Sequence, residues 1–346
     1  MIDWIKAIVP LRHHERLSSG EIQAIDGETG QIEWRSPKRL KVEGSQSSSV
    51  TVRSSDLRHV EIDGNPAKFL QGHNIFGSDD LHCLAVAFFE QVAARLGIEV
   101  PAEDRDAWGR GEYVLKRVDV TESFRLPSQA DVHAWIRAAQ STVTGKHQAA
   151  SAYAGDTFYL GKNSRRIATK VYAKAAELRK HKLPESLPAR GRLLEFAEGL
   201  LRFEVVIRAM ELRRRGLSSP KNWTPQTPRA IVEERVRAMR LNQKVRLKNE
   251  EIDDLPPRLR GAYALWRSGE DLRNIYSKAT FYRYRAELLR YGVDLAAKAP
   301  QQGEAVPLIR FLSAEHVDAV PSWATAAGLL YEAELGATSP HLELVV

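Results

Sequence analysis

Residues 165–178 read RRIATKVYAKAAEL, a run in which one tyrosine stands between two lysines. A β-strand over this segment places alternate side chains on opposite faces, so Lys170, Tyr172 and Lys174 share one face. Since nearby positive charge favours an ionised phenol, the pattern predicts a tyrosine biased towards phenolate, beside lysines that bind phosphate. Such a tyrosine can attack a phosphodiester and stay attached to one DNA end. The alternative is an ordinary amphipathic strand with solvated lysines.

Two further segments alternate in the same way and carry charge in mid-strand. Residues 113–121 read YVLKRVDVT and place Arg117 and Asp119 on one face, and residues 201–208 read LRFEVVIR and place Arg202 and Glu204 on one face. If the three strands pair in one sheet, that face holds two carboxylates, a tyrosine and several cations. Carboxylates with open positions suit Mg²⁺ or Mn²⁺. The alternative is an antiparallel sheet with one solvated face.

Three runs carry a resemblance to a known family. Residues 66–81 read PAKFLQGHNIFGSDDL, residues 194–204 read LEFAEGLLRFE, and residues 306–311 read VPLIRF, followed by Pro321 and Trp323. These runs resemble, in the same order, motifs of the gene II/X replication initiators of filamentous bacteriophages, relatives of plasmid rolling-circle initiators. The resemblance extends from residue 1 to about residue 325.

The resemblance implies an enzyme that nicks one strand of the phage origin and is joined through tyrosine to the 5′ end. Tyr172 falls on the matching position, so we expect it to be the nucleophile, with Tyr159 and Tyr153 as the next candidates. Residues 168–171 depart from the family pattern, because the best-known member is wholly apolar there. The roles implied for the other site residues are catalytic for Lys170 and Lys174, metal-binding for Asp119, Glu204 and His73, and DNA-binding for Arg117 and Arg202. For His73, a turn-stabilising or helix-capping role is equally consistent with the motif.

The composition is typical of a globular protein that binds a polyanion. The chain has 346 residues, 43% of them apolar, and a net charge of +7, which supports real cores and fits a nucleic-acid partner. The single cysteine, Cys83, excludes an internal disulfide and a cysteine-rich zinc site. The sequence contains no Walker-A loop and no His-x-His pair. We expect no membrane span and a location in the host bacterial cytoplasm.

The pattern of strands and helices predicts an α+β fold, an antiparallel sheet with helices on one face. Residues 21–25 and 31–34 flank the turn signal DGETG and predict a hairpin. Further strands are expected at 49–53, 57–62, 157–160, 167–174 and 201–208, and helices at 79–96, 129–143 and 191–199. Ser128 and Asp131 form a predicted capping box for the second of these helices.

Prolines after residue 216 predict a domain boundary. We expect a catalytic DNA-nicking domain over 1–216, a linker with a basic helix over 217–257, and a smaller helical DNA-binding domain over 258–346. Helices are predicted at 229–251, 258–268 and 278–291. On the last, Tyr282, Arg283 and Arg285 are expected to be exposed, as on a DNA recognition helix, although a charged surface helix is the alternative.

The resulting hypothesis is a metal-dependent, sequence-specific initiator of phage rolling-circle replication. Its expected partners are phage origin DNA, host helicase and polymerase, and a second copy of the chain on the origin. The competing hypothesis is a non-catalytic DNA-binding regulator of phage or plasmid replication built on the basic helices. Metal-dependent nicking with covalent attachment separates the two.

Overall fold

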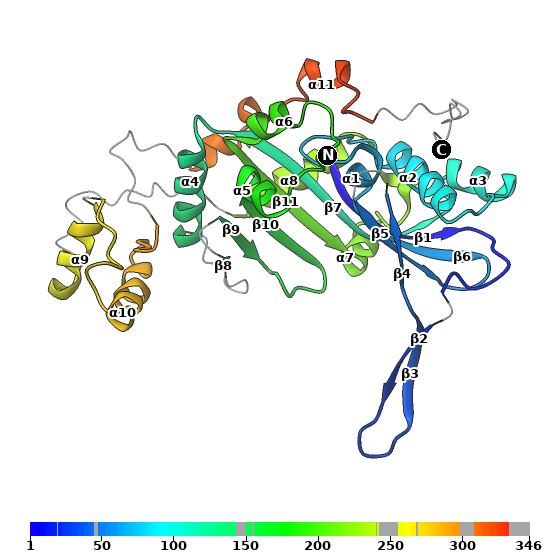
Figure 1. The fold of residues 1–346 in the computed structure, drawn as a ribbon, viewed down its shortest axis with the longest axis horizontal. Helices are drawn as coiled ribbons and strands as arrows, with labels where there is room; N and C mark the ends of the chain where they lie inside the picture. The colour runs from blue at the N-terminus through cyan, green and yellow to red at the C-terminus, as the bar shows by residue number, and fades with distance from the viewer. Residues whose placement is uncertain are drawn as a thin grey trace.

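The computed structural model describes residues 1–18, 20–44, 48–142, 150–153, 156–239, 241, 255–267, 269–297 and 308–331. Its centre is a nine-stranded sheet in which every pair of neighbouring strands is antiparallel (Figure 1). In spatial order the strands are β4 (Leu40–Glu43), β5 (Ser49–Ser54), β6 (His59–Gly64), β1 (Ile2–Pro10), β7 (Val114–Arg125), β11 (Leu200–Arg208), β10 (Ile167–Ala173), β9 (Thr157–Leu160) and β8 (Ala150–Tyr153). The α+β prediction is therefore confirmed.

A separate two-stranded hairpin projects from this sheet (Figure 1). It consists of β2 (Glu21–Ile25) and β3 (Ile32–Pro37), close to the predicted positions. Asp26 builds its turn, because Oδ1 accepts hydrogen bonds from the backbone N–H groups of Glu28 and Thr29 at 3.0 and 2.6 Å. Gly30 closes the turn with a φ of 69°, a conformation that glycine adopts without steric cost.

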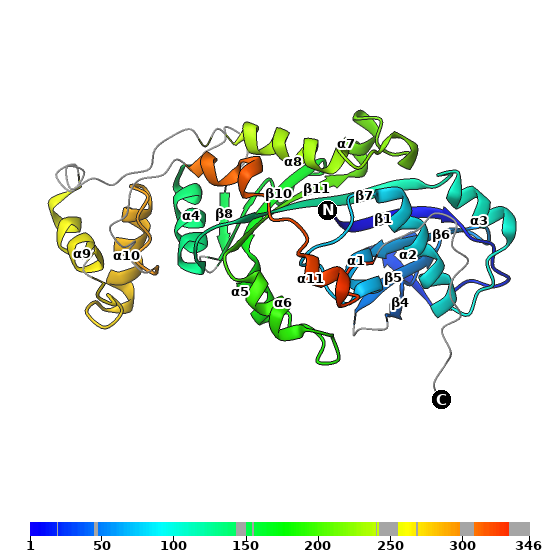
Figure 2. The same ribbon diagram turned by 90° about the horizontal axis from the view of Figure 1, so that it is seen from above.

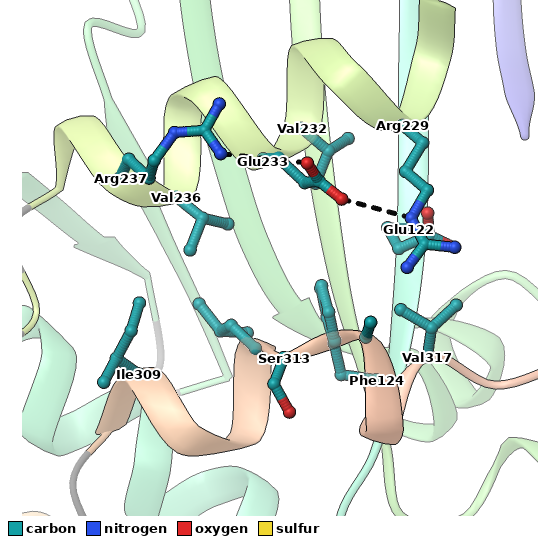
Figure 3. Close-up of a pocket in the computed structure, with 12 residues that line it drawn as sticks. Glu122, Phe124, Arg229, Val232, Glu233, Val236, Arg237, Ile309, Ser313 and Val317 are labelled. Carbon is teal, nitrogen blue, oxygen red and sulfur yellow. Dashed lines mark hydrogen bonds and ion pairs between the residues drawn. The ribbon is translucent and has the colours of Figure 1, made fainter. Parts of the chain in front are cut away.

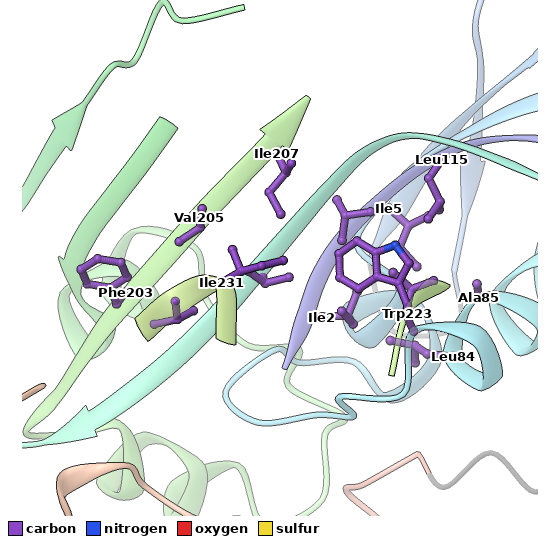
Figure 4. Close-up of a cluster of buried hydrophobic side chains, with 14 of the residues drawn as sticks. Ile2, Ile5, Leu84, Ala85, Leu115, Phe203, Val205, Ile207, Trp223 and Ile231 are labelled. Atoms are coloured by element: carbon purple, nitrogen blue, oxygen red, sulfur yellow. The ribbon is translucent and has the colours of Figure 1, made fainter. Parts of the chain in front are cut away.

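One face of the large sheet carries the main hydrophobic core. It is covered by α2 (Leu81–Arg95), α4 (Gln129–Thr142) and α8 (Thr227–Ala238). Figure 4 shows β11 side chains such as Phe203 beside Ile231 of α8, and Trp223 surrounded by residues of β1, β7 and α2. Strand residues reach this face because apolar side chains alternate with polar ones along β1, β10 and β11. Ser128 Oγ accepts from the Asp131 N–H, which is one half of the predicted capping box, and donates to the Asp131 carboxylate.

Helices also lie over part of the other face, which corrects the expectation that one face carries them all. Figure 2 shows α5 (Lys174–Lys180), α6 (Arg190–Ala197) and α11 (Ser322–Ala326) on the side opposite α8. They share a second core that includes Ile75, Leu178 and Leu193. Further short elements are α1 (Pro66–Gln71), α3 (Ala102–Gly109), α7 (Ala209–Arg214) and the 3₁₀ turns η1 (Pro220–Asn222), η3 (Leu308–Leu312) and η4 (Ala314–His316).

A small helical unit has its own core and lies beside α4 (Figure 2). It contains α9 (Pro257–Arg267) and α10 (Lys278–Leu289), and its buried residues include Tyr263, Trp266 and Phe281.

The chain then returns to the large sheet, because Leu308, Leu312 and Ala324 are buried in the body cores. The predicted domain boundaries are corrected in two places: residues 220–238 pack on the body rather than linking it, and residues 308–331 do not belong to the helical unit. Residues 240 and 242–251 of the predicted basic helix lie outside the described residues.

In the part of the chain that the structure describes, every helix is too short or too polar to cross a bilayer.

Candidate active site

Strand pairing brings the sequence-predicted residues onto one face of the sheet. Directly opposed residues of antiparallel strands share a face. Lys170 of β10 is paired with Glu204 of β11, which is paired with Thr121 of β7, and Tyr172 is paired with Arg202. Asp119 lies two residues from Thr121 and therefore shares the face. We call this the polar face; the opposite one carries Phe203 and the main core.

Tyr172 lies on the polar face but is only 3% exposed. Burial, reinforced by the negative charge of Glu204, raises the pKa of its hydroxyl well above the usual value of 10. The predicted bias towards phenolate is therefore wrong for this state of the protein. The Lys170 ammonium lies 4.0 Å from the centre of the Tyr172 ring, a cation–π contact. Among the described residues no hydrogen bond engages the Tyr172 hydroxyl.

Lys174 does not extend the strand, as the alternation had predicted, but begins α5. Its side chain is fully buried, and Nζ donates to Asn74 Oδ1 at 2.9 Å and to Glu177 Oε2 at 2.7 Å. Burial lowers its pKa to about 8, although Glu177 opposes that shift. The role predicted for Lys174 as an exposed phosphate ligand is corrected, because its donors are used within the protein.

The two predicted metal-binding carboxylates are both buried, Asp119 at 1% and Glu204 at 7% exposure. Arg117 binds Asp119 through two hydrogen bonds of 2.8 and 2.5 Å. Burial nevertheless raises the pKa of Asp119 to about 7, with Glu204 acting in the same direction. Burial also raises the pKa of Glu204, whose nearest cation is Lys170 at 3.6 Å. Two acidic groups thus lie close together where water stabilises their charge poorly.

Arg202 is a structural anchor in this structure, which corrects its assignment to DNA binding. The residue is 1% exposed. Its guanidinium donates to the backbone oxygens of Asn74 and Ile75 at 2.5 and 2.7 Å and to Thr121 Oγ1 at 2.8 Å. Arg117 differs, because its side chain remains 34% exposed and lies 5.2 Å from the Trp4 ring. Arg117 and Lys170 are therefore the predicted cations on this face that retain access to solvent.

The Gln71-Gly72-His73-Asn74 motif forms the loop that Arg202 holds. His73 is fully buried, and Nε2 donates to the Leu329 carbonyl at 2.8 Å while Nδ1 accepts from the Ile75 N–H at 3.3 Å. Burial lowers its pKa to about 4, so the ring is neutral. With both ring nitrogens engaged, His73 has the turn-stabilising role and offers no lone pair to a metal, which corrects the metal assignment in this structure.

Asp3 is a site residue that the sequence analysis missed. Its Oδ1 accepts from the side-chain amides of Asn65 and Asn74 at 3.1 and 2.7 Å. Its negative charge contributes to the raised pKa values of Asp119 and Glu204, which places it near both. The available signal was the acidic residue inside an apolar first strand. The residue interrupts the regular pairing of β1 with β7, where the register shifts between Ile2 and Trp4.

On α10, two of the three predicted DNA-binding residues are exposed. Tyr282 is 53% exposed and Arg283 lies beside Tyr284 on the surface. Arg285 is half-buried, and Asp294 holds its guanidinium through hydrogen bonds of 2.5 and 2.8 Å. The expectation of an exposed Arg285 is therefore wrong. Arg290, which follows Arg283 by two helical turns and so lies on the same side, is exposed.

A cavity of about 250 Å³ lies on the opposite side of the sheet (Figure 3). It is bounded by β7, α8 and residues 309–317, with Phe124, Val232 and Val236 forming apolar walls. Glu233 of α8 lies between Arg229 and Arg237 and is ion-paired to both. Because Phe124 shares its face with the main core, this cavity is separated from Tyr172 by the sheet.

Comparisons with known proteins cover both halves of the chain. Residues 1–226 match the family described as the N-terminal part of the phage replication-associated protein, the gene II product, and residues 247–329 match the family of its C-terminal part. The replication-associated protein of Enterobacteria phage I2-2 is 36% identical over 327 residues, covering 91% of this chain and 94% of the relative. That of phage M13 is 29% identical over 46% of this chain and 42% of the relative.

Among solved structures, a rolling-circle replication initiator from Geobacillus stearothermophilus aligns with a TM-score of 0.27 and 9% identity, over 63% of this chain and 78% of that one. The family matches and the I2-2 relative together span nearly the whole sequence. The chain therefore belongs to the family of gene II-type replication-associated proteins of filamentous bacteriophages.

Proposed function

We propose that this protein initiates rolling-circle replication by nicking one strand of its phage origin through Tyr172. The observation that carries the proposal is the convergence on one sheet face of Tyr172, Lys170 and the carboxylates Asp119 and Glu204. A relative at 36% identity bears the name of a replication-associated protein. Origin DNA is then the substrate, and host helicase and polymerase act on the nicked product.

In the proposed reaction the Tyr172 oxygen bonds to the scissile phosphorus while the bond to the 3′-oxygen breaks. The Tyr172 hydroxyl gives its proton to solvent as the new bond forms, the departing 3′-oxygen takes up a proton to become a hydroxyl, and the DNA 5′ end remains as a phosphotyrosine. Lys170 and Arg117 neutralise the phosphate charge. Because the ester conserves the energy of the phosphodiester, a released 3′-hydroxyl can later close the strand without ATP.

Burial of Tyr172 adds a condition to this mechanism. Tyr172 is only 3% exposed in the free protein, so a local rearrangement must precede its contact with a phosphate. We propose that binding of the single strand opens the polar face and stabilises the phenolate through its cations. The same burial is the observation that favours the competing function, a DNA-binding regulator with a purely structural Tyr172.

Mg²⁺ or Mn²⁺ is proposed as the cofactor, with Asp119, Glu204 and Asp3 as the residues that would hold it. The donors are carboxylate oxygens, which these ions prefer. Within the described ranges, no three acidic, histidine or cysteine side chains are already arranged to bind a metal. Arg117 would have to release Asp119 for the ion to bind. When bound, the cation would polarise the scissile phosphate.

The decisive experiment incubates supercoiled DNA carrying the phage intergenic region with wild type, Tyr172→Phe and Tyr159→Phe, followed by denaturing electrophoresis. Tyr159 is the matched control, because it is paired with Lys170 from β9 and shares the polar face. We expect Tyr172→Phe to abolish nicking and covalent attachment while origin binding stays within about twofold, since only the nucleophilic oxygen is lost. Covalent attachment by the Tyr172→Phe variant would place the nucleophile elsewhere. Absence of nicking by wild type with Mg²⁺ or Mn²⁺ would favour the regulator.

A further inference from the structure

The hairpin formed by β2 and β3, which we call the arm, exposes an unusual amount of apolar surface. Ile22, Ile25, Ile32 and Trp34 are 51%, 60%, 41% and 53% exposed. Trp34 is paired with Ala24, next to Ile22 on the same face, and Ile25 is paired with Ile32 nearer the tip. Large apolar side chains gathered on one projecting element mark an interaction surface.

The arm is a regular hairpin whose base is fixed by hydrogen bonds. Its strands pair only with each other among the described residues, which leaves both outer edges unpaired. At the base, the Lys38 N–H donates to the Gly20 carbonyl at 2.8 Å, and Arg53 donates to Ser36 Oγ at 2.8 Å. An isolated two-stranded hairpin is marginally stable in water. A partner that covers its apolar side chains would stabilise it.

Charge identifies the kind of partner. Residues 21–37 contain four acidic groups and one basic group, a net charge of −3, whereas the whole chain carries +7. DNA phosphates would repel this arm, because affinity for DNA comes largely from cations placed on phosphates. Two arms would also repel each other, because both carry a net negative charge. The basic body of another copy of this chain complements the arm in charge.

We propose that the arm docks on the body of a second copy of this chain and holds a self-associated form together. This inference goes beyond the proposed nicking activity, because the arm lies well away from β10, the strand that carries Tyr172, in Figure 1. Apolar side chains of the arm supply the buried contact, and its carboxylates select the basic surface of the partner copy.

The first test compares the self-association of full-length wild type and Ile22→Ser/Trp34→Ser by sedimentation velocity over a concentration series. We expect the double variant to raise the dissociation constant by about 100-fold, the scale of losing central apolar anchors. Leu57→Ser/Met210→Ser is the matched control, since these side chains are 51% and 50% exposed outside the arm. An arm variant that associates as tightly as wild type would overturn the proposal, as would a wild type that stays monomeric at about 100 µM.

A second variant separates docking from folding. Glu21→Gln/Glu28→Gln/Glu33→Gln leaves the apolar side chains in place and should weaken association and reduce its dependence on salt. Mixing intact protein with a copy in which residues 21–37 are replaced by a short Gly-Ser linker tests the receiving surface. A mixed species is expected, because the armless copy keeps its body. Its absence would indicate arm-to-arm contact and overturn the proposal.

DNA measurements complete the test. Nicking of a single-stranded oligonucleotide should be unchanged in the Ile22→Ser/Trp34→Ser variant, so failure of the docking proposal and failure of the nicking proposal are distinguishable. If that variant instead loses affinity for a duplex while its self-association is unchanged, the arm binds DNA, and the proposal is wrong.

Discussion

Burial of charged side chains decides which residues of the candidate site can meet a nucleic acid. Arg202 donates to the backbone oxygens of residues 74 and 75, and Lys174 donates to the side chains of Asn74 and Glu177. Arg117 and Lys170, in contrast, remain partly exposed. The alternation in the sequence assigns all four cations to the same face as Tyr172 and does not distinguish between them. Their different surroundings divide them into two cations that support the site from within and two that can contact phosphate.

Asp119 provides a prediction about charge in the site. Asp119→Asn should reduce nicking by about 10²-fold or more, the usual scale for losing preorganised electrostatic stabilisation. The substitution keeps the shape of the side chain but removes the charge that Arg117 binds. Nicking rates with increasing Mg²⁺, measured for the variant and wild type, check this expectation. Nicking by wild type in excess EDTA would remove the metal from the mechanism while leaving Tyr172 as the nucleophile.

Arg202 provides a contrasting prediction about stability. Arg202→Met should lower the free energy of unfolding by about 2–4 kcal/mol, because it leaves buried backbone oxygens without donors. Arg213→Met is the control, since Arg213 lies exposed on α7 and should change stability by less than about 0.5 kcal/mol. Urea denaturation measures both. Equal stabilities, with weakened DNA binding only in Arg202→Met, would restore Arg202 as a DNA contact.

At the scale of elements, ion pairs fix how helices meet the sheet. Glu211 of α7 is 2% exposed and is bound by Arg166, next to β10, as well as by Arg214 and Arg215. The hydrogen bond from Arg214, with those of Arg215 and Arg166, lowers the Glu211 pKa from 4.5 to about 2, against the effect of burial. This cluster connects α7 to the strand that carries Tyr172.

The Glu211 cluster predicts a dependence of stability on pH. Because the folded-state pKa is depressed, its contribution is present above about pH 4.5 and is lost as pH falls towards 2. Glu211→Gln should lower the free energy of unfolding by about 1–3 kcal/mol at pH 7, less than the full pKa shift implies, because Arg166 and Arg214 are half exposed. Denaturation at pH 7 and pH 3 checks this, with Glu195→Gln as the control, since Glu195 is exposed and lies outside the cluster. A cost that stays constant with pH would indicate packing rather than charge.

The exposed side of α10 predicts a measurable salt effect on origin binding. Arg283→Ala/Arg290→Ala should flatten the slope of log affinity against log salt by about 2 units, one for each lost phosphate contact. Arg285→Ala is the matched control, because Asp294 already holds its guanidinium, and it should leave the slope unchanged. A salt titration of origin binding for the three proteins is the measurement. An unchanged slope in the double variant would place origin recognition outside α10.

At the scale of the whole molecule, local patterns predicted the strands better than the contacts between distant segments. Alternation located β10 and β11, the turn signal DGETG located the arm, and the family resemblance proposed Tyr172, Asp119 and Glu204 as candidate site residues. None of these signals could reveal that Arg202 donates to the backbone of Asn74, 128 positions away in the chain, or that His73 donates to the Leu329 carbonyl, 256 positions away. These contacts depend on tertiary packing, which leaves no periodic signal in either segment. The packing of residues 220–238 and 308–331 on the body was missed for the same reason.

The return of residues 308–331 to the sheet has a consequence for dissecting the molecule. The two family matches, 1–226 and 247–329, divide the chain between segments that share cores. A fragment made from the first half alone would leave the His73 loop uncovered, and one made from the second half would expose Leu308, Leu312 and Trp323 to water. Neither piece is a complete folding unit, but the two should recombine when mixed, because each carries the surface that the other lacks. Such complementation in trans would rebuild the body with a break in its chain.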